Sequence, residues 1–265
     1  MLDILVCVKQ VPDINLVKMD PVTGSLIRAG VPAILNPHDA NALEAAVQVK
    51  EKYGGMVTAI TMGPDAAAEA LRECMASGAD RAVLLSDRAF ANADTLATSY
   101  VIATAAQRLE SFELIFCGKE SLDGATGQMG AQLAQRFDTA LVSSTLLIRG
   151  VDEEAGTAVA DRLLESGVET LEVRLPALFT VEKANYPARI PKLKGKLAAK
   201  KAAITVITSD DIPGLDKSRI GDPGSPTKVP RMFPPVLPEP GVIIDEGSTE
   251  AAAARLLQII AGQRS

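Results

Sequence analysis

Short runs of β-branched and apolar residues alternate with longer segments rich in alanine and leucine through the first half of the chain. The runs have the length of buried strands, and the longer segments have the periodicity of helices. This alternation is typical of an α/β fold on a parallel sheet. The predicted strands are residues 2–8, 56–62, 82–85 and 114–117, and the predicted helices are residues 36–55, 65–77, 94–109 and about 126–137.

The pattern changes after about residue 140, where apolar runs are separated by glycine-containing turns with no room for helices. Residues 141–150, 157–165 and 168–175 are therefore predicted to be antiparallel strands added to the same domain. A hairpin is predicted within residues 17–28, around Thr23-Gly24. Residues 221–241 hold seven prolines, which favours an extended arm. A short helix over residues 249–260 should follow, with Ser248 as its N-cap.

The composition narrows the class of function. The chain has 27 Lys and Arg against 33 Asp and Glu, a net charge of −6 and a pI near 5.0, which gives no general reason to bind nucleic acid. No apolar stretch approaches the roughly 20 residues of a membrane span, and the apolar run between Asp3 and Lys9 is too short for a signal peptide. These features predict a cytoplasmic protein. The single histidine and the absence of Cys-x-x-Cys leave little material for a metal site. Three cysteines in apolar runs, Cys7, Cys74 and Cys117, are expected to be buried and reduced.

A ligand of an open parallel sheet binds at the carboxyl ends of the strands, near helix N-termini. Four turns meet this description: residues 8–10, 36–39, 62–64 and 118–130. The last combines four glycines with Ser121 and Thr126, so its backbone can approach a phosphate closely. It is a candidate nucleotide phosphate site. Glycines that only form turns are the alternative, and neither G-x-G-x-x-G nor a Walker pattern is present.

Several motifs follow one another in a recognisable order. They are ILVCVKQVPD, LNPHDANALEAA, TMGP, SGADRAVLLSDR, FCGKESLDGATGQMGAQLA and LPALFTVEKANYPARIPKLKGKLAAKK. In order and spacing these segments, which cover at least residues 1–201, resemble the small (beta) subunit of electron transfer flavoproteins. The most specific pieces are the loop from Gly118 to Gly124 and the stretch from LPAL to the lysine-rich segment.

The resemblance implies a Rossmann-like open, mostly parallel sheet with an antiparallel addition and an extended C-terminal arm. Residues 1–205 would form a nucleotide-binding α/β domain, and residues 206–265 an extended proline-rich arm and short C-terminal helix that contact the larger alpha subunit, which carries an FAD. In the family the crevice of the beta subunit holds an adenine nucleotide. Carried over by position, this site would be Cys7, Val8, Lys9, Asn36, Pro37, His38, Asp39, Met62, Gly63, Gly118, Lys119, Ser121, Asp123, Gly124, Ala125, Thr126, Gly127, Gln128 and Met129.

Members of the family differ in what fills that crevice. One class holds AMP as a structural filler, and the other holds a second FAD, which takes hydride from NADH and splits its two electrons. The short spacing from Asp123-Gly124 to Thr126 and the tail SPTKVPRMFPP are similar to the bifurcating class. Ala125 departs from that class, and Glu165-Ser166-Gly167 departs from the AMP class. The resemblance favours the bifurcating type, with Lys9 and His38 as candidates by position for tuning the flavin. Its partners would be an acyl-CoA or other flavin dehydrogenase, and ferredoxin as an acceptor.

The basic stretch from 183 to 201 holds seven Lys and Arg and no acidic residue. By resemblance it contains the family's recognition loop, with Ile190 as its apolar anchor between two prolines. Arg189, Lys192 and Lys194 would steer an acidic partner. A solvated lysine-rich loop is the alternative.

A function of a different class is an ATP-binding, universal-stress-like regulatory module, whose fold also surrounds an adenine nucleotide. It would require a triphosphate loop that ends in Gly-Ser or Gly-Thr, which residues 118–130 lack.

Overall fold

The computed structural model describes residues 1–13, 16, 18–19, 26–27, 31–183, 185–228, 241 and 243–262. The chain forms two units, Met1–Pro230 and Arg231–Ser265. The first unit runs past the predicted boundary at residue 205, because the segment that follows adds a strand to the sheet and packs on a helix. Contact of residues 206–265 with a partner subunit stays a prediction.

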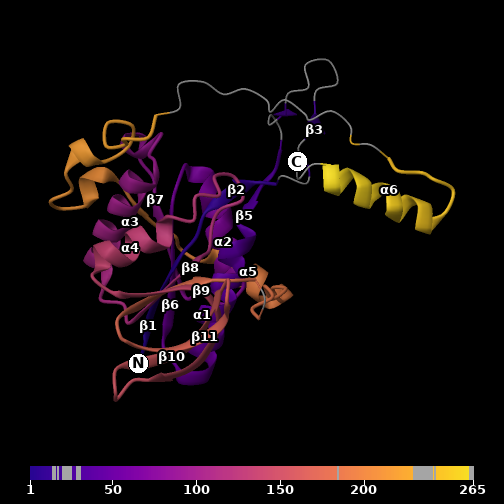
Figure 1. Cartoon of the computed structure of the whole chain (residues 1–265). Helices are drawn as coiled ribbons and strands as arrows, with labels where there is room; N and C mark the ends of the chain where they lie inside the picture. Colours follow the sequence, from indigo (N-terminus) through magenta and orange to yellow (C-terminus); the bar gives the residue numbers. More distant parts are fainter. Residues whose placement is uncertain are drawn as a thin grey trace. The chain divides into compact units, whose positions relative to one another are not determined.

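The first unit is built on a nine-stranded sheet in the order β11-β10-β9-β12-β8-β1-β6-β7-β13 (Figure 1). Neighbours from β9 to β13 in this order pair in parallel, and β9, β10 and β11 pair antiparallel. The α/β prediction and the antiparallel addition are therefore confirmed. The strands are β1 Asp3–Cys7, β6 Met56–Met62, β7 Arg81–Leu85, β8 Leu114–Gly118, β9 Ala140–Asp152, β10 Thr157–Leu164, β11 Gly167–Arg174, β12 Ala177–Val181 and β13 Thr205–Ile207.

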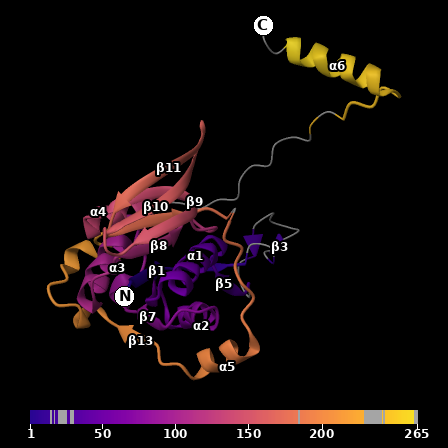
Figure 2. The same ribbon diagram turned by 90° about the horizontal axis from the view of Figure 1, so that it is seen from below.

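Helices cover both faces of the parallel part of the sheet, as Figure 2 shows. Alternate residues of β1 enter two separate cores: Ile4 packs with α1 and α2, and Leu5 packs with α3 and α4. All three cysteines are buried and free, as predicted. The helices are α1 Pro37–Tyr53, α2 Ala68–Ala76 after a 3-10 turn at Asp65–Ala67, α3 Thr95–Leu109, α4 Met129–Phe137 and α5 Leu193–Lys201.

Two small antiparallel sheets lie beside the main one. In the first, β2 (Gln10–Pro12) pairs with β5 (Ala33–Leu35). In the second, β3 (Lys18–Met19) pairs with β4 (Leu26–Ile27), as expected for the two arms of the predicted hairpin. Its turn at Thr23-Gly24 lies outside the described residues.

The structure adds to or differs from the predictions in three local details. Helix α4 begins at Met129, not near Thr126, because Gly127 has a positive φ of 61° that a helix cannot continue through. The lysine cluster is helical in part, since α5 covers residues 193–201. Residues 221–224, at the start of the predicted arm, form turns, residues 225–228 have no regular secondary structure, and residues 229–240 lie outside the described part.

The second unit contains one described helix, α6 (Thr249–Gly262). The hydroxyl oxygen of Ser248 accepts a hydrogen bond from the Ala251 N–H at 3.2 Å, so the predicted N-cap is confirmed. Within the described part of the chain, helices with the length and apolar character of a membrane span are absent.

Candidate functional site

The strand order reverses beside β1. The chain runs from β1 through β6 to β7 on one side and then returns to β8 on the other side of β1. Connections that leave in opposite directions open a crevice at the carboxyl ends of β1 and β8. Cys7 is level with Cys117 in β8 and with Ile60 in β6, so the three strands end close together. The first, second and fourth predicted turns meet at this crevice.

Asp39, in the first turn of α1, bridges the two strand ends. Its carboxylate accepts hydrogen bonds from the N–H of Lys9 at 2.8 Å and from the N–H of Gly118 at 3.0 Å. A Cβ on Gly118 would lie 2.6 Å from Asp39 Oδ1, so glycine is required at that position. Burial raises the pKa of Asp39 to about 7, although the two N–H donors act to lower it. Asp39 therefore holds the crevice together, and its buried carboxylate is not directed at a ligand.

Asn36 connects α1 to the glycine-rich loop. It is the N-cap residue of α1, but its side chain makes no capping hydrogen bond. It donates from Nδ2 to the carbonyl of Glu120 at 2.9 Å and accepts from the N–H of Leu122 at 3.2 Å. Its own N–H donates to the carbonyl of Lys9 at 2.9 Å. Asn36 thus fixes the start of the loop against the end of β1.

The loop between β8 and α4 reaches over the crevice. Lys9 Nζ donates to both carboxylate oxygens of Asp123, at 2.8 and 2.7 Å. The N–H of Ala125 donates to the carbonyl of Ser121, which makes a tight turn just before Gly127. The N–H groups of residues 126–128 have no hydrogen-bond partner among the described residues, and this part of the loop is exposed. Free N–H groups ahead of a helix suit an anion such as a phosphate.

Other predicted residues have different surroundings. His38 Nδ1 is buried without a hydrogen-bond partner in the described part, beside Gly118. Cys7 packs in the core behind the crevice, where burial raises the pKa of its thiol.

The third predicted turn lies one strand further from β8 than the end of β1 does. The N–H of Gly63 in this turn donates to the carbonyl of Leu85 in β7 at 3.0 Å. Lys119 pairs with Glu182 at 2.9 Å. Pro37 opens α1 and Met129 opens α4.

One residue at the edge of the loop was not predicted from the sequence. The hydroxyl of Thr95, at the start of α3, donates to Gln128 Oε1 at 3.0 Å and accepts from Gln132 Nε2 at 3.2 Å. The Asp94-Thr95 pair at a helix start was the available signal, since Asp94 caps α3 through the N–H of Ala97.

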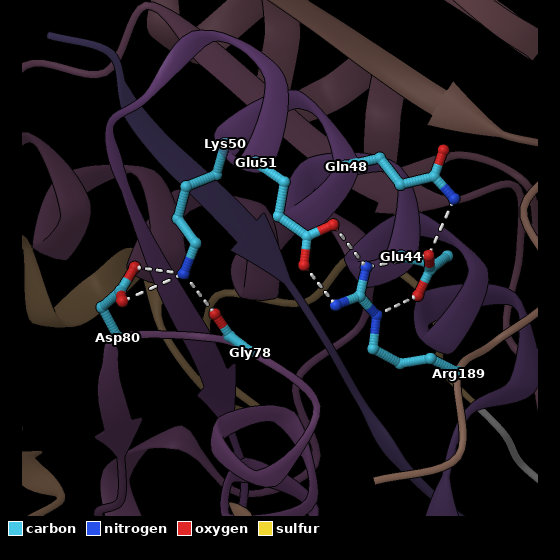
Figure 3. Close-up of polar contacts among 7 residues, drawn as sticks. All are labelled: Glu44, Gln48, Lys50, Glu51, Gly78, Asp80 and Arg189. Carbon is cyan, nitrogen blue, oxygen red and sulfur yellow. Dashed lines mark hydrogen bonds and ion pairs between the residues drawn. The ribbon is translucent and has the colours of Figure 1, made fainter. Parts of the chain in front are cut away.

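Two residues, Tyr186 and Arg189, hold the candidate recognition loop against the rest of the domain just before Ile190. Tyr186 is buried, and its hydroxyl accepts from the N–H of Ile148 at 2.7 Å. Arg189 forms ion pairs with Glu44 at 2.7 Å and Glu51 at 2.6 Å, both on α1 (Figure 3). These bonds raise the pKa of the Arg189 guanidinium and neutralise its charge within the chain.

The next residue, Ile190, is 89% exposed. Arg189 therefore holds the loop against α1 while Ile190 projects into solvent. Lys192 is the N-cap residue of α5, and Lys194 lies in its first turn. Their role in docking stays a prediction.

The chain is an α/β protein with an open sheet, and a glycine-rich loop lies over the switch point, where the strand order reverses beside β1. The family model for the electron transfer flavoprotein domain matches residues 23–212, more than half of the chain. The chain belongs to the electron transfer flavoprotein family, and the relatives below place it among the beta subunits.

The chain is 44% identical to the electron transfer flavoprotein subunit beta of Thermoanaerobacterium thermosaccharolyticum, over 94% of this chain and 95% of the relative. It is also 44% identical to subunit CarD of the caffeyl-CoA reductase-Etf complex of Acetobacterium woodii, over 96% of each. Protein FixA of Bradyrhizobium diazoefficiens is 41% identical, over 94% of this chain and 88% of the relative.

Proposed function

We propose that this chain is the small subunit of a heterodimeric electron transfer flavoprotein, which passes electrons between dehydrogenases and a downstream acceptor. We further propose that the crevice between β1 and β8 holds a second FAD, through which the heterodimer bifurcates electrons from NADH. The observation that carries the proposal is the exposed loop over the switch point, with unpartnered N–H groups at residues 126–128. The similarity to CarD favours the bifurcating form.

The residues at the crevice suit a dinucleotide. The loop N–H groups would donate to its phosphates, and Lys9 could move from Asp123 to offset their charge. His38 Nδ1 is a buried polar atom that still lacks a partner in the described chain. A bound flavin would supply the acceptance of hydride and the release of single electrons. The protein's part is to position the cofactor and to set the charges around it.

A plain carrier with structural AMP in the crevice is the second candidate. The same loop would hold one phosphate, and the FAD of the large subunit would carry the electrons alone. The similarity to the beta subunit of Thermoanaerobacterium thermosaccharolyticum is compatible with either form. In both forms we propose a cytoplasmic heterodimer that receives electrons from or delivers them to an acyl-CoA or other flavin dehydrogenase, with ferredoxin as a further acceptor in the bifurcating form.

Cofactor content separates the two candidates. We expect the co-expressed heterodimer to release two FAD and no AMP on denaturation, and stopped-flow mixing with NADH to bleach its flavin absorbance. One FAD and one AMP per heterodimer, without bleaching by NADH, would establish the plain carrier instead. A heterodimer without nucleotide in this subunit would contradict both forms.

A second test concerns the exposed anchor of the loop. Ile190→Ala is expected to slow electron transfer to the dehydrogenase about fivefold at limiting partner concentration, since about 1 kcal/mol of apolar burial would be lost at the interface. Transfer rates are measured against partner concentration, with flavin content and heterodimer assembly checked separately. Leu109→Ala, which truncates an exposed apolar side chain at the end of α3, is the control. Equal rates for Ile190→Ala and the unaltered protein would exclude Ile190 as the anchor.

A further inference from the structure

A cavity of about 290 Å³ is lined by α3, α4 and the segment that follows residue 216, and by none of the residues predicted to form the crevice. Its walls come from three segments distant in sequence: the first turns of α3, the last turn of α4 and the turns that follow residue 216. Two arginines, two serines and apolar side chains line it. The lining residues are Leu96, Tyr100, Arg136, Ser218, Arg219 and residues 223–226.

The two arginines, Arg136 and Arg219, lie against the same aromatic ring. The guanidinium of Arg219 is 4.1 Å from the ring centre of Tyr100, and that of Arg136 is 5.3 Å away. Neither guanidinium has an ion-pair partner in the described chain. Arg136 donates only to uncharged oxygens, the hydroxyl of Ser99 and the carbonyl of Leu96. Burial and the nearby charge of Arg219 lower the pKa of Arg136, which indicates that the two positive charges repel each other.

The acidic side chains of the same loop are occupied elsewhere. Asp216 accepts from the N–H and the hydroxyl of Ser218, at 2.9 and 2.6 Å. Asp222 pairs with Lys228 at 3.0 Å. The loop therefore hydrogen-bonds its carboxylates to its own donors. Asp216 attracts Arg219 only electrostatically, without an ion pair, and Arg136 has no carboxylate partner in the described chain. In a chain with a net charge of −6, such a pair of guanidinium groups marks a local anion site.

The wall opposite the helices is held firmly in place. Ser225 Oγ accepts from the N–H of Asp94 at 2.8 Å and donates to the carbonyl of Gly221 at 2.6 Å. Asp94 also accepts from the N–H of Thr227 at 3.0 Å, so the N-cap of α3 fixes this loop. A Cβ on Gly224 would collide with the backbone of Arg219. The cavity is thus a built feature of the fold, defined by specific backbone contacts.

We propose that this cavity binds the phosphate group of a small phosphorylated molecule. Two guanidinium groups match the charge of a phosphate monoester, which is close to −2 at neutral pH, and their planar donors suit its oxygens. The ring of Tyr100 and the side chains of Leu96, Pro223 and Pro226 provide apolar surface for the organic part. The volume accommodates a molecule of the size of a phosphorylated ring, and the cavity shares no lining residue with the predicted nucleotide crevice.

Calorimetric titration of the full-length chain with phenyl phosphate, at constant ionic strength, tests the proposal. We expect saturable binding that is about fivefold weaker in Arg219→Gln. Lys217→Gln is the matched control, because it removes the same charge from the same loop, where Lys217 pairs with exposed Asp210 outside the cavity. The guanidinium of Arg219 lies over the Tyr100 ring and makes no hydrogen bond within the described chain, so its replacement should leave the fold intact, which thermal unfolding would check.

The crevice could also bind a phosphate, and the test must separate the two sites. Binding of phenyl phosphate that persists in Gly124→Val supports the cavity, and binding lost in Gly124→Val but retained in Arg219→Gln overturns the proposal. An absence of saturable binding, or equal weakening in Arg219→Gln and Lys217→Gln, overturns it as well. These outcomes do not depend on which cofactor the heterodimer carries.

Discussion

Asp39→Asn is expected to lower the free energy of unfolding by about 1–3 kcal/mol, because a buried backbone N–H would lose its acceptor. The carboxylate accepts from both Lys9 and Gly118, and only one oxygen remains in the amide. Whichever way the amide turns, its NH₂ group faces one of the two N–H donors. Asp39 is only 6% exposed to solvent, so water cannot replace the missing acceptor.

The effect of this substitution should depend on pH. The pKa of Asp39 is raised to about 7 in the folded chain, from near 4 when unfolded. Between these values the unfolded carboxyl has lost its proton while the folded one keeps it, so the stabilisation from Asp39 falls as the pH rises. The difference in unfolding free energy between the unaltered chain and Asp39→Asn should therefore be larger at pH 5 than at pH 8.

Urea unfolding of the full-length chain at the two pH values measures this difference. Asp210→Asn is the control, because its carboxylate is exposed in its pair with Lys217. A stability difference for Asp39→Asn that stays constant from pH 5 to pH 8 would show that the Asp39 carboxylate is ionised throughout. An unchanged unfolding free energy would contradict its bridging role.

Gly124→Val is expected to reduce nucleotide binding in this subunit at least tenfold, equivalent to about 1.4 kcal/mol or more. A branched side chain at this point would stand between the loop backbone and the phosphates. The fold should tolerate the change, since a Cβ on Gly124 would only contact Ser121 Oγ at 3.5 Å and its φ is not positive. The measurement is the nucleotide content of the purified heterodimer after dialysis.

Gly150→Val is the matched control for this substitution. Gly150 lies in β9, and a Cβ there would meet only the Tyr53 hydroxyl, at 3.8 Å. Full nucleotide content in Gly124→Val would place the nucleotide elsewhere. Equal loss in both variants would indicate a general effect of valine on stability, and the loop would then have no specific role in binding.

Local patterns predicted the parallel strands and most helices because each depends on contacts within a short segment. The apolar run at 2–8 and the cap at Ser248 are examples. The patterns misplaced the start of α4. Gly127 has a left-handed backbone conformation, so the helix begins after it, at Met129, and not near residue 126. They missed β13 because its three residues become a strand only by pairing with the edge strand β7.

The sequence by itself determined the sheet, its crevice and the glycine-rich loop, because strand ends and glycine positions follow from local periodicity and backbone freedom. Only the tertiary structure decided which polar side chains meet. It placed Asp39 between Lys9 and Gly118, and it bound Arg189 to Glu44, 145 residues away in the chain. It also brought Arg136 and Arg219 onto the ring of Tyr100. Such contacts depend on how distant segments pack, and no local pattern encodes that packing.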